Sequence, residues 1–283
     1  MRGLFSKPPP PPPPVVPSLT LWEAFNDPWV QQWAFGLLAL QAVLMVVLSI
    51  IPSPMSEDVG VAAHQLTIAV PFAYAAYHGA RLWFFDEAFA AMGTSAHGRL
   101  YAASEDCFSL TRFMFGMQVF DLMVTFIVPS MRKLEHLVHH GLTLATALCG
   151  LSGPYLMYQA GFFFGLVEIS SVPLVFVDLF RKYPALHEKS KIGDALNEFV
   201  RLSFAVTFLL IRCVMWPVVV MQLVLDLISV YRAGQLQGGF QMMIFGCTCS
   251  VLTFLQLYWG YKVVAATVKM LKGDRSDREK EAQ

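Results

Sequence analysis

Charged residues are scarce in this chain, and the two signs balance. Only 14% of the 283 residues are Asp, Glu, Lys or Arg, whereas 56% are hydrophobic and the mean hydropathy is +0.54. Soluble domains carry about 25% charged residues, so the composition excludes an ordinary soluble domain and indicates a membrane protein. The formal net charge of zero at pH 7 argues against a nucleic-acid partner.

Cysteine is also rare, and its spacing excludes a disulfide framework. The five cysteines lie in or beside apolar runs, as small buried residues commonly do (Cys107, Cys149, Cys213, Cys247 and Cys249). No repeat of about 20–50 residues is present, and the N-terminus lacks a signal-peptide pattern. Seven prolines, Pro8–Pro14, instead predict a polyproline II tail, either a spacer or a ligand for a proline-recognising domain.

Long apolar runs dominate the rest of the chain and predict an all-α polytopic membrane protein of about seven transmembrane helices. Each run approaches or exceeds the ~20 residues that cross a hydrocarbon core. A segment rich in tryptophan, Leu21–Val30, precedes them and is typical of the membrane interface. The sixth run is too long for one straight span, and Pro217 predicts a kink in it. The expected spans are 31–52, 61–85, 107–129, 134–151, 155–180, 199–230 and 240–268.

Basic residues are concentrated in alternate loops. With seven spans, the loops 53–60, 130–133 and 181–198 share one side with the C-terminal tail, and they hold most of the Lys and Arg residues outside the spans. The positive-inside rule therefore predicts a cytosolic C-terminus and places the proline tail across the membrane.

Three of the seven histidines lie within five residues, at the start of the fourth apolar run. His136, His139 and His140 follow the basic pair Arg132 and Lys133. Ionisable groups inside a membrane span are costly and are functional candidates by default. Residues four or three apart share a helix face, so His136 faces both partners, whereas His139 and His140 point about 100° apart.

Counting residues from the span ends arranges the polar residues in two layers. At 1.5 Å per residue, Asp121 lies about 12 Å deep and the adjacent histidines about 8–9 Å deep. Glu168 and Arg212 lie at about 18 and 20 Å, and Tyr258 and Trp259 at about 14–15 Å. An unpaired buried charge costs far more than a paired one, so we expect Glu168 and Arg212 to interact.

The shallower layer has the residue types of general-base chemistry. A carboxylate such as Asp121 can orient an imidazole and raise its basicity; a structural role for the histidines, bonding neighbouring helices, is the alternative. His64 and Arg81 lie near opposite ends of the second span and carry less weight as candidates.

The spacing His136, His139, His140 also fits one histidine box of membrane di-iron oxidases. Two irons need about eight histidines in three boxes, because imidazole supplies most of the ligands. This chain has seven, four of them scattered singly. The expectation is therefore no metal site, with a single metal ion on His139, His140 and Asp121 as the remaining alternative.

Four segments in sequence order carry a family resemblance: His139–Thr143, Leu166–Pro173, Phe208–Arg212 and Leu255–Lys262. They resemble successive signatures of the TLC domain family, whose members include the ceramide synthases. Asp121 falls where the family often carries an aspartate, and the resemblance covers about 58–270. It divides the chain into a proline-rich tail and interfacial segment (1–30), a first helix (31–57), the TLC domain (58–270) and a charged tail (271–283).

The resemblance implies a helical bundle around a membrane cavity. By position, His139 and His140 correspond to the pair that serves acyl transfer from acyl-CoA to a sphingoid base in ceramide synthases. Asp121 would be the orienting carboxylate. The residues expected to line the cavity or bind substrate are His136, Glu168, Arg212, Tyr258 and Trp259. The chain departs from the synthases after the pair, where it reads Ala-Leu-Cys-Gly-Leu-Ser-Gly-Pro and lacks their Asn, Arg and His-Asp pattern.

Two main functions remain open at this point. One is acyl-CoA-dependent N-acyltransfer in sphingolipid or ceramide metabolism, with acyl-CoA as co-substrate and no cofactor. The other is a non-catalytic protein that binds, senses or transports membrane lipids; a histidine-box oxidase is third. The family implies the endoplasmic reticulum and membrane lipids as partners, and a homo-oligomer is left open.

Overall fold

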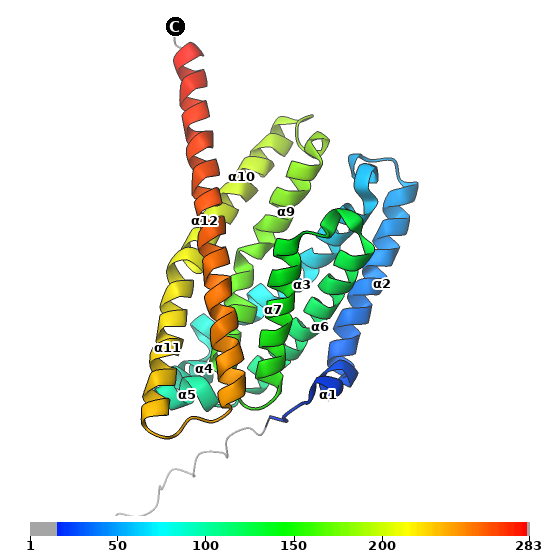
Figure 1. Ribbon diagram of the computed structural model, residues 1–283. Helices are drawn as coiled ribbons and strands as arrows, with labels where there is room; N and C mark the ends of the chain where they lie inside the picture. Colours follow the sequence, from blue (N-terminus) through cyan, green and yellow to red (C-terminus); the bar gives the residue numbers. More distant parts are fainter. Residues whose placement is uncertain (1–15, 282–283) are drawn as a thin grey trace, which may run out of the picture.

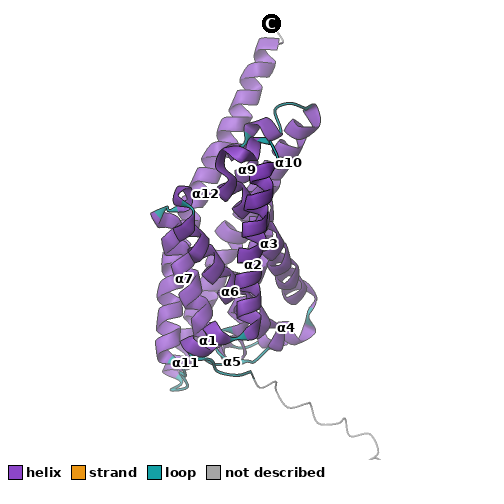
Figure 2. Ribbon diagram, turned by 90° about the vertical axis from the view of Figure 1, so that its right-hand side faces the viewer, coloured by secondary structure: helices purple, strands orange, loops and turns teal. Residues whose placement is uncertain are grey.

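In the computed structural model, which describes residues 16–281 and side chains as far as Lys269, helices form every regular element (Figures 1 and 2). The expected proline tail at 8–14 lies outside the described residues. Seven antiparallel passes make up the bundle, and two of them are composite. The passes are α2 (Pro28–Ile50), α3 (Val59–Phe85), α6 (Glu105–Ile127), α7 (Leu134–Leu151), α8 with α9 (Met157–Ala160 and Ser171–Lys182), α10 with α11 (Lys191–Phe208 and Trp216–Arg232) and α12 (Gly239–Glu281).

Short helices cap the two ends of the bundle. The N-terminal α1 (Leu21–Asn26) begins with a capping box in which Thr20 and Glu23 bond each other's backbone amides. Asp27 then caps α2 and accepts from the amides of Trp29 and Val30. The other short elements are α4 (Glu87–Met92), α5 (Ala96–Tyr101), η1 (Pro54–Asp58), η2 (Pro129–Met131) and η5 (Pro184–Leu186).

Six passes of the described chain are long and apolar enough to cross a membrane, so the chain is a multi-pass integral membrane protein. The predicted fourth span forms α7 at the expected residues, but it is not among the six. Its 18 residues reach about 27 Å at 1.5 Å per residue. Its three histidines and Glu135 lower its apolar character. In Figure 1, α7 nevertheless runs alongside the other passes.

The connections follow the predicted alternation. The α2–α3, α6–α7 and α9–α10 connections lie at the end of the bundle where α12 projects toward the C-terminus, at the top of Figure 1. The first described residues lie at the opposite end, where the Leu19 amide donates to the carbonyl of Leu151 (2.8 Å). The predicted basic loops therefore share one end of the bundle, and their assignment to the cytosol stays a prediction.

Two passes are interrupted near their centres. The fifth changes from α8 to a π-helical turn (η3, Gly161–Gly165) and a 3₁₀ turn (η4, Leu166–Ile169) before α9. The sixth contains a π-helical segment (η6, Leu209–Met215) directly before the predicted kink at Pro217, whose ring nitrogen cannot donate to the preceding turn. Irregular backbone is tolerated in a membrane only where protein or a cavity covers it, and η3 is buried throughout.

Glycine allows the interrupted fifth pass to touch α3. A Cβ atom placed on Gly79 would lie 2.1 Å from the backbone carbonyl carbon of Gly165, a distance that no side chain can adopt. Among the six candidate spans, the fifth pass and α6 are also the most buried. In each of them, 67% of the apolar 18-residue stretch that could cross the membrane is buried inside the bundle. These two passes therefore form the centre on which the site is built.

Candidate functional site

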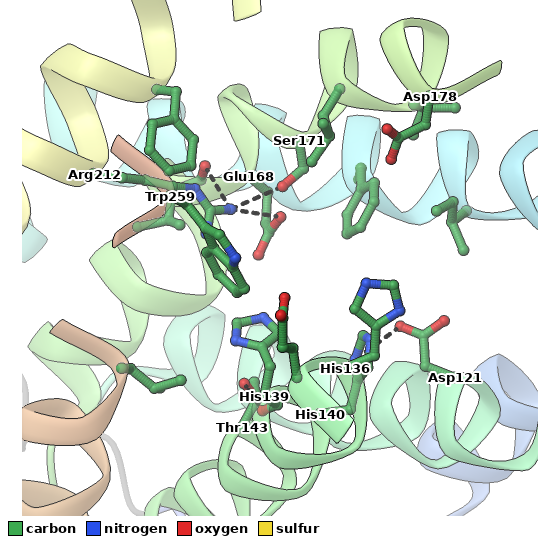
Figure 3. A pocket seen from close by; sticks show the side chains of 18 of the residues that line it. Asp121, His136, His139, His140, Thr143, Glu168, Ser171, Asp178, Arg212 and Trp259 are labelled. Carbon is green, nitrogen blue, oxygen red and sulfur yellow. Dashed lines mark hydrogen bonds and ion pairs between the residues drawn. The ribbon is translucent and has the colours of Figure 1, made fainter. Parts of the chain in front are cut away.

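A cavity of about 470 Å³ lies among α3, α6, α7, α9, the sixth pass and α12 (Figure 3). Along α12 its lining extends from Val263 to Cys249, fourteen residues or about 21 Å of helix. Charged side chains line the end nearest the C-terminus, and aromatic and aliphatic ones, including Phe163 and Trp216, line the other. The cavity is therefore elongated, with a polar mouth and an apolar far end.

Asp121 anchors the shallower polar layer and is only 2% exposed. His64 on α3 lies with its Nε2 2.9 Å from Asp121 Oδ1. His140 on α7 lies with its Nδ1 3.5 Å from Asp121 Oδ2 and 2.8 Å from Gln118 Oε1. One carboxylate and one amide of α6 thus position histidines from two other helices.

The surroundings of His140 favour one tautomer. The two atoms nearest to Nδ1 are oxygens, Gln118 Oε1 at 2.8 Å and Asp121 Oδ2 at 3.5 Å, which suits an imidazole with its proton on Nδ1. The other ring nitrogen, Nε2, is then the unprotonated one and can accept a proton. Asp121 stabilises the imidazolium that would form, which is the relation that a general base requires.

His139 occupies a different part of the cavity wall. Its ring centroid lies 5.5 Å from that of Trp259 and 5.4 Å from that of His140. Among the described residues, its buried Nδ1 atom has no hydrogen-bond partner. His136 also lines the cavity, with its ring centroid 6.3 Å from that of His140. A buried polar atom without a partner is unusual, and here it adjoins space that a ligand can fill.

The deeper layer is the predicted pair Glu168 and Arg212, which the structure confirms with Arg212 Nη2 3.6 Å from Glu168 Oε2 (Figure 3). Glu168 lies in the 3₁₀ turn η4 and Arg212 in the π-helical segment η6. Arg212 also donates from Nε to Ser170 Oγ and from Nη2 to Ser171 Oγ, each at 2.8 Å, and to the Val167 carbonyl at 3.4 Å. The guanidinium thereby ties the sixth pass to the fifth.

Both members of this pair keep bonding capacity. Within the described residues, Glu168 Oε2 accepts no hydrogen bond. The hydrogen bonds of Arg212 all come from Nε and Nη2, so its Nη1 is available as a donor. Both residues line the cavity. The deeper layer can therefore accept a proton donor on the carboxylate and donate to an oxygen from the guanidinium.

Tyr258 does not join the other predicted cavity residues. Its side chain is 48% exposed and is absent from the cavity lining, and Lys262 Nζ lies 4.2 Å from its ring centroid. The next residue, Trp259, does line the cavity. Neighbours on a helix point about 100° apart, so the depth count that selected both residues could not separate them.

Sequence reasoning missed His64 and Gln118. His64 is buried, with 5% of its surface exposed. The second pass begins earlier than the predicted span, because the 3₁₀ turn η1 leads directly into α3 at Val59. His64 therefore lies deeper in the bundle than the prediction placed it. Counted from Val59, its depth is about 8 Å, close to the 9 Å of Asp121 counted from Ile127. With the correct helix start, the depth count would have placed His64 level with Asp121. Gln118 could have been identified because it lies one turn from Asp121 on the same face of α6.

Only some of the basic residues near the mouth of the cavity face it. Lys133, Arg181 and Lys262 line the cavity. Arg132 instead donates to the carbonyl of Phe126 (2.5 Å). Lys182 pairs with Asp58 through Nζ–Oδ2 at 3.4 Å. Both are thereby held away from the cavity.

No group of three or more His, Cys, Asp or Glu side chains in the described part of the chain is arranged to hold a metal ion.

The sequence model of the TLC domain family matches residues 60–265 of this chain, whereas no curated protein and no solved structure matches it. That match covers most of the bundle, including every residue of the two polar layers. The chain therefore belongs to the TLC domain family.

Proposed function

We propose that this TLC domain protein acts in membrane lipid metabolism as an acyl-CoA-dependent N-acyltransferase for sphingoid bases, located in the endoplasmic reticulum. The family supports a lipid-related function in the membrane. The observation that carries the chemistry is His140, whose Nδ1 lies 2.8 Å from Gln118 Oε1 and 3.5 Å from Asp121 Oδ2, an arrangement that leaves Nε2 to accept a proton. A long amphiphile fits a cavity with a polar mouth and an apolar end.

In the proposed reaction, the amine nitrogen of the base attacks the thioester carbonyl carbon. The C–N bond forms as His140 Nε2 takes the amine proton. Collapse of the tetrahedral intermediate breaks the C–S bond, and the imidazolium returns its proton to the leaving thiolate, so that the products are the amide and free CoA. General base and general acid catalysis by one positioned imidazole contributes about 10²–10⁴-fold.

The remaining cavity residues have supporting roles. Arg212 Nη1 can donate to the developing oxyanion, which preorganised donors in a water-poor site stabilise strongly. Glu168 can accept from a hydroxyl or ammonium group of the base, and His139, beside Trp259, can bond the same substrate through its unpartnered Nδ1. Lys133, Arg181 and Lys262 at the mouth suit the phosphates of CoA.

The test is N-acylation of a sphingoid base by acyl-CoA in membranes that contain the protein. His140→Ala should lower kcat by at least about 10²-fold. His97→Ala is the matched control, because His97 lies in α5, outside the cavity lining, and packs against Tyr101 with the rings tilted (5.0 Å between centroids). Activity in the control that is lost in the cavity variant, at equal protein abundance, would establish the acyl transfer.

A second candidate rests on the deeper layer alone. The Glu168 and Arg212 pair can hold a polar headgroup with no chemical step, as a non-catalytic lipid-binding, sensing or transport protein requires. Absence of acyl transfer in the unsubstituted protein, together with sphingoid-base binding that Glu168→Gln weakens, would select this function. Bound iron in the purified protein would select neither and would support the oxidase.

A further inference from the structure

A second cavity, of about 580 Å³, is lined by residues of α9, α10 and α12 and of the connection between α9 and α10. This connection lies at the end of the bundle where α12 projects toward the C-terminus (Figure 1). We call it the α9–α10–α12 groove. Three cationic side chains line it, Arg181 from α9, Arg201 from α10 and Lys262 from α12. They lie within about three turns of the ends of their candidate spans, at Lys182, Lys191 and Lys269. The groove thus carries its charge near the membrane interface.

The charge in the groove is largely uncompensated. Arg181 pairs with Asp178 (Nη2–Oδ1 2.6 Å), whereas Arg201 and Lys262 have no ion-pair partner among the residues whose side chains are described. Glu188 is the one acidic side chain in the described lining. His187, also in the lining, faces Asp194 at 3.0 Å. The groove therefore favours an anion that approaches Arg201 and Lys262.

Apolar side chains make up the remainder of the groove and continue from it across the lipid-facing surface. Phe180, Leu202 and Ala266 lie in the lining beside the cations. Farther along α10, Val206 is 48% exposed and Leu210 is 56% exposed. A soluble anion would gain nothing from these surfaces, whereas acyl chains could lie along them.

The groove adjoins the central cavity but is distinct from it. Four residues line both spaces: Arg181, Phe204, Lys262 and Val263. Arg201 and Glu188 line the groove alone. They can therefore be changed without altering the wall of the central cavity.

We propose that the α9–α10–α12 groove binds the phosphate headgroup of an anionic membrane phospholipid. The phosphate lies between Arg201 and Lys262, and the acyl chains follow the exposed face of α10 toward the membrane centre. Guanidinium and ammonium groups are the usual partners of phosphate oxygens in proteins. Lys262 lines both spaces, so the test is made at Arg201 and Glu188, which line the groove alone, and its outcome does not depend on the acyl-transfer reaction.

The test uses the full chain in detergent, with native mass spectrometry to measure dissociation constants for dioleoyl phosphatidic acid and, as the zwitterionic reference, dioleoyl phosphatidylcholine. Arg201→Ala should weaken binding of phosphatidic acid about fivefold, the effect of one basic residue near a membrane surface. Glu188→Gln should strengthen it by a similar factor, because it removes the acidic side chain from the lining. A gain of affinity cannot result from misfolding, so this pair of opposite shifts identifies the site.

Two matched controls accompany these variants. Arg201→Lys keeps the charge and should bind within about twofold of the original chain. Arg232→Ala removes an exposed arginine at the other end of the bundle and should change nothing. Equal affinity for the two lipids, or Arg201→Ala and Arg232→Ala behaving alike, would overturn the proposal. Displacement of phosphatidic acid by millimolar inorganic phosphate would overturn it too, because the groove would then be a site for soluble phosphate.

Discussion

Removing one member of the Glu168 and Arg212 pair should destabilise the bundle unequally, depending on which member is removed. Arg212→Met leaves the Glu168 carboxylate buried without its cation and deletes the bonds to Ser170 and Ser171. Breaking a buried pair in this way costs about 3–5 kcal/mol. Glu168→Gln is milder, because the guanidinium keeps its two serine acceptors and the Val167 carbonyl. Its expected cost is about 1–3 kcal/mol.

The double variant decides whether the two residues act as a pair. Glu168→Gln with Arg212→Met removes both charges, so its cost should fall below the sum of the single costs by at least about 1 kcal/mol. Arg232→Gln, which changes an exposed arginine, should be neutral within about 0.5 kcal/mol.

Thermal unfolding in detergent measures this series. For a chain of this size, 1 kcal/mol shifts the midpoint by roughly 2–4 °C, so Arg212→Met should lower it by roughly 6–20 °C. Two results would refute the reasoning: costs that simply add in the double variant, or a larger loss from Glu168→Gln than from Arg212→Met. Additive costs would mean that the 3.6 Å approach of the two groups carries no stabilising interaction. A larger loss from Glu168→Gln would mean that the serine and carbonyl acceptors do not compensate the unpaired guanidinium.

Three further changes test other parts of the structure. Gln118→Leu removes the amide oxygen beside His140 Nδ1 and should lower kcat for acyl transfer about fivefold to tenfold with KM unchanged. A loss equal to that of His140→Ala would contradict a positioning role for Gln118. Asp226 pairs with Arg99 of α5 (Oδ2–Nε 2.6 Å). Asp226→Asn leaves this guanidinium without its buried carboxylate, so thermal unfolding should show a loss of about 3 kcal/mol, and an unchanged midpoint would argue against the pair. Gly79→Ala should destabilise the bundle by about 3 kcal/mol or prevent folding, because its Cβ would meet the facing backbone at 2.1 Å. The control is Gly36→Ala, whose Cβ would meet nothing within 4 Å and which should be neutral or stabilising in the same assay.

Depth along a helix could be predicted from the sequence because it follows from residue counts alone. Glu168 and Arg212 have opposite charges at matching depth, and the high cost of an unpaired buried charge leaves few arrangements other than contact. The same count placed Asp121 near the histidines of α7, and the structure brings it to His140. Apolar run length likewise located the passes within a few residues of the observed helices, except for the start of the sixth, where α10 begins at Lys191, eight residues before the predicted span.

Direction around a helix could not be predicted in the same way. Tyr258 and Trp259 share a depth but not a face, and only packing decides which of them meets the cavity. The π-helical and 3₁₀ turns that hold Arg212 and Glu168 have no local signal, because their sequences are as apolar as those of regular helices. His64 was missed because a 3₁₀ turn and its capping residue Asp58 extend the second pass beyond the predicted span.

The histidines of α7 also determine how that pass can enter a membrane. They and Glu135 make α7 the one pass of the described bundle that is not apolar enough to be recognised as a span by composition. Lipid alone therefore holds it weakly, and it depends on the packing of α6 and α12 on either side. Replacing His136, His139 and His140 by leucine should improve insertion of α7 while it removes the polar wall of the cavity. A chain in which α7 stayed outside the membrane would place the following helices in inverted orientation. The same three histidines therefore affect both the polar wall of the cavity and the topology of every later pass.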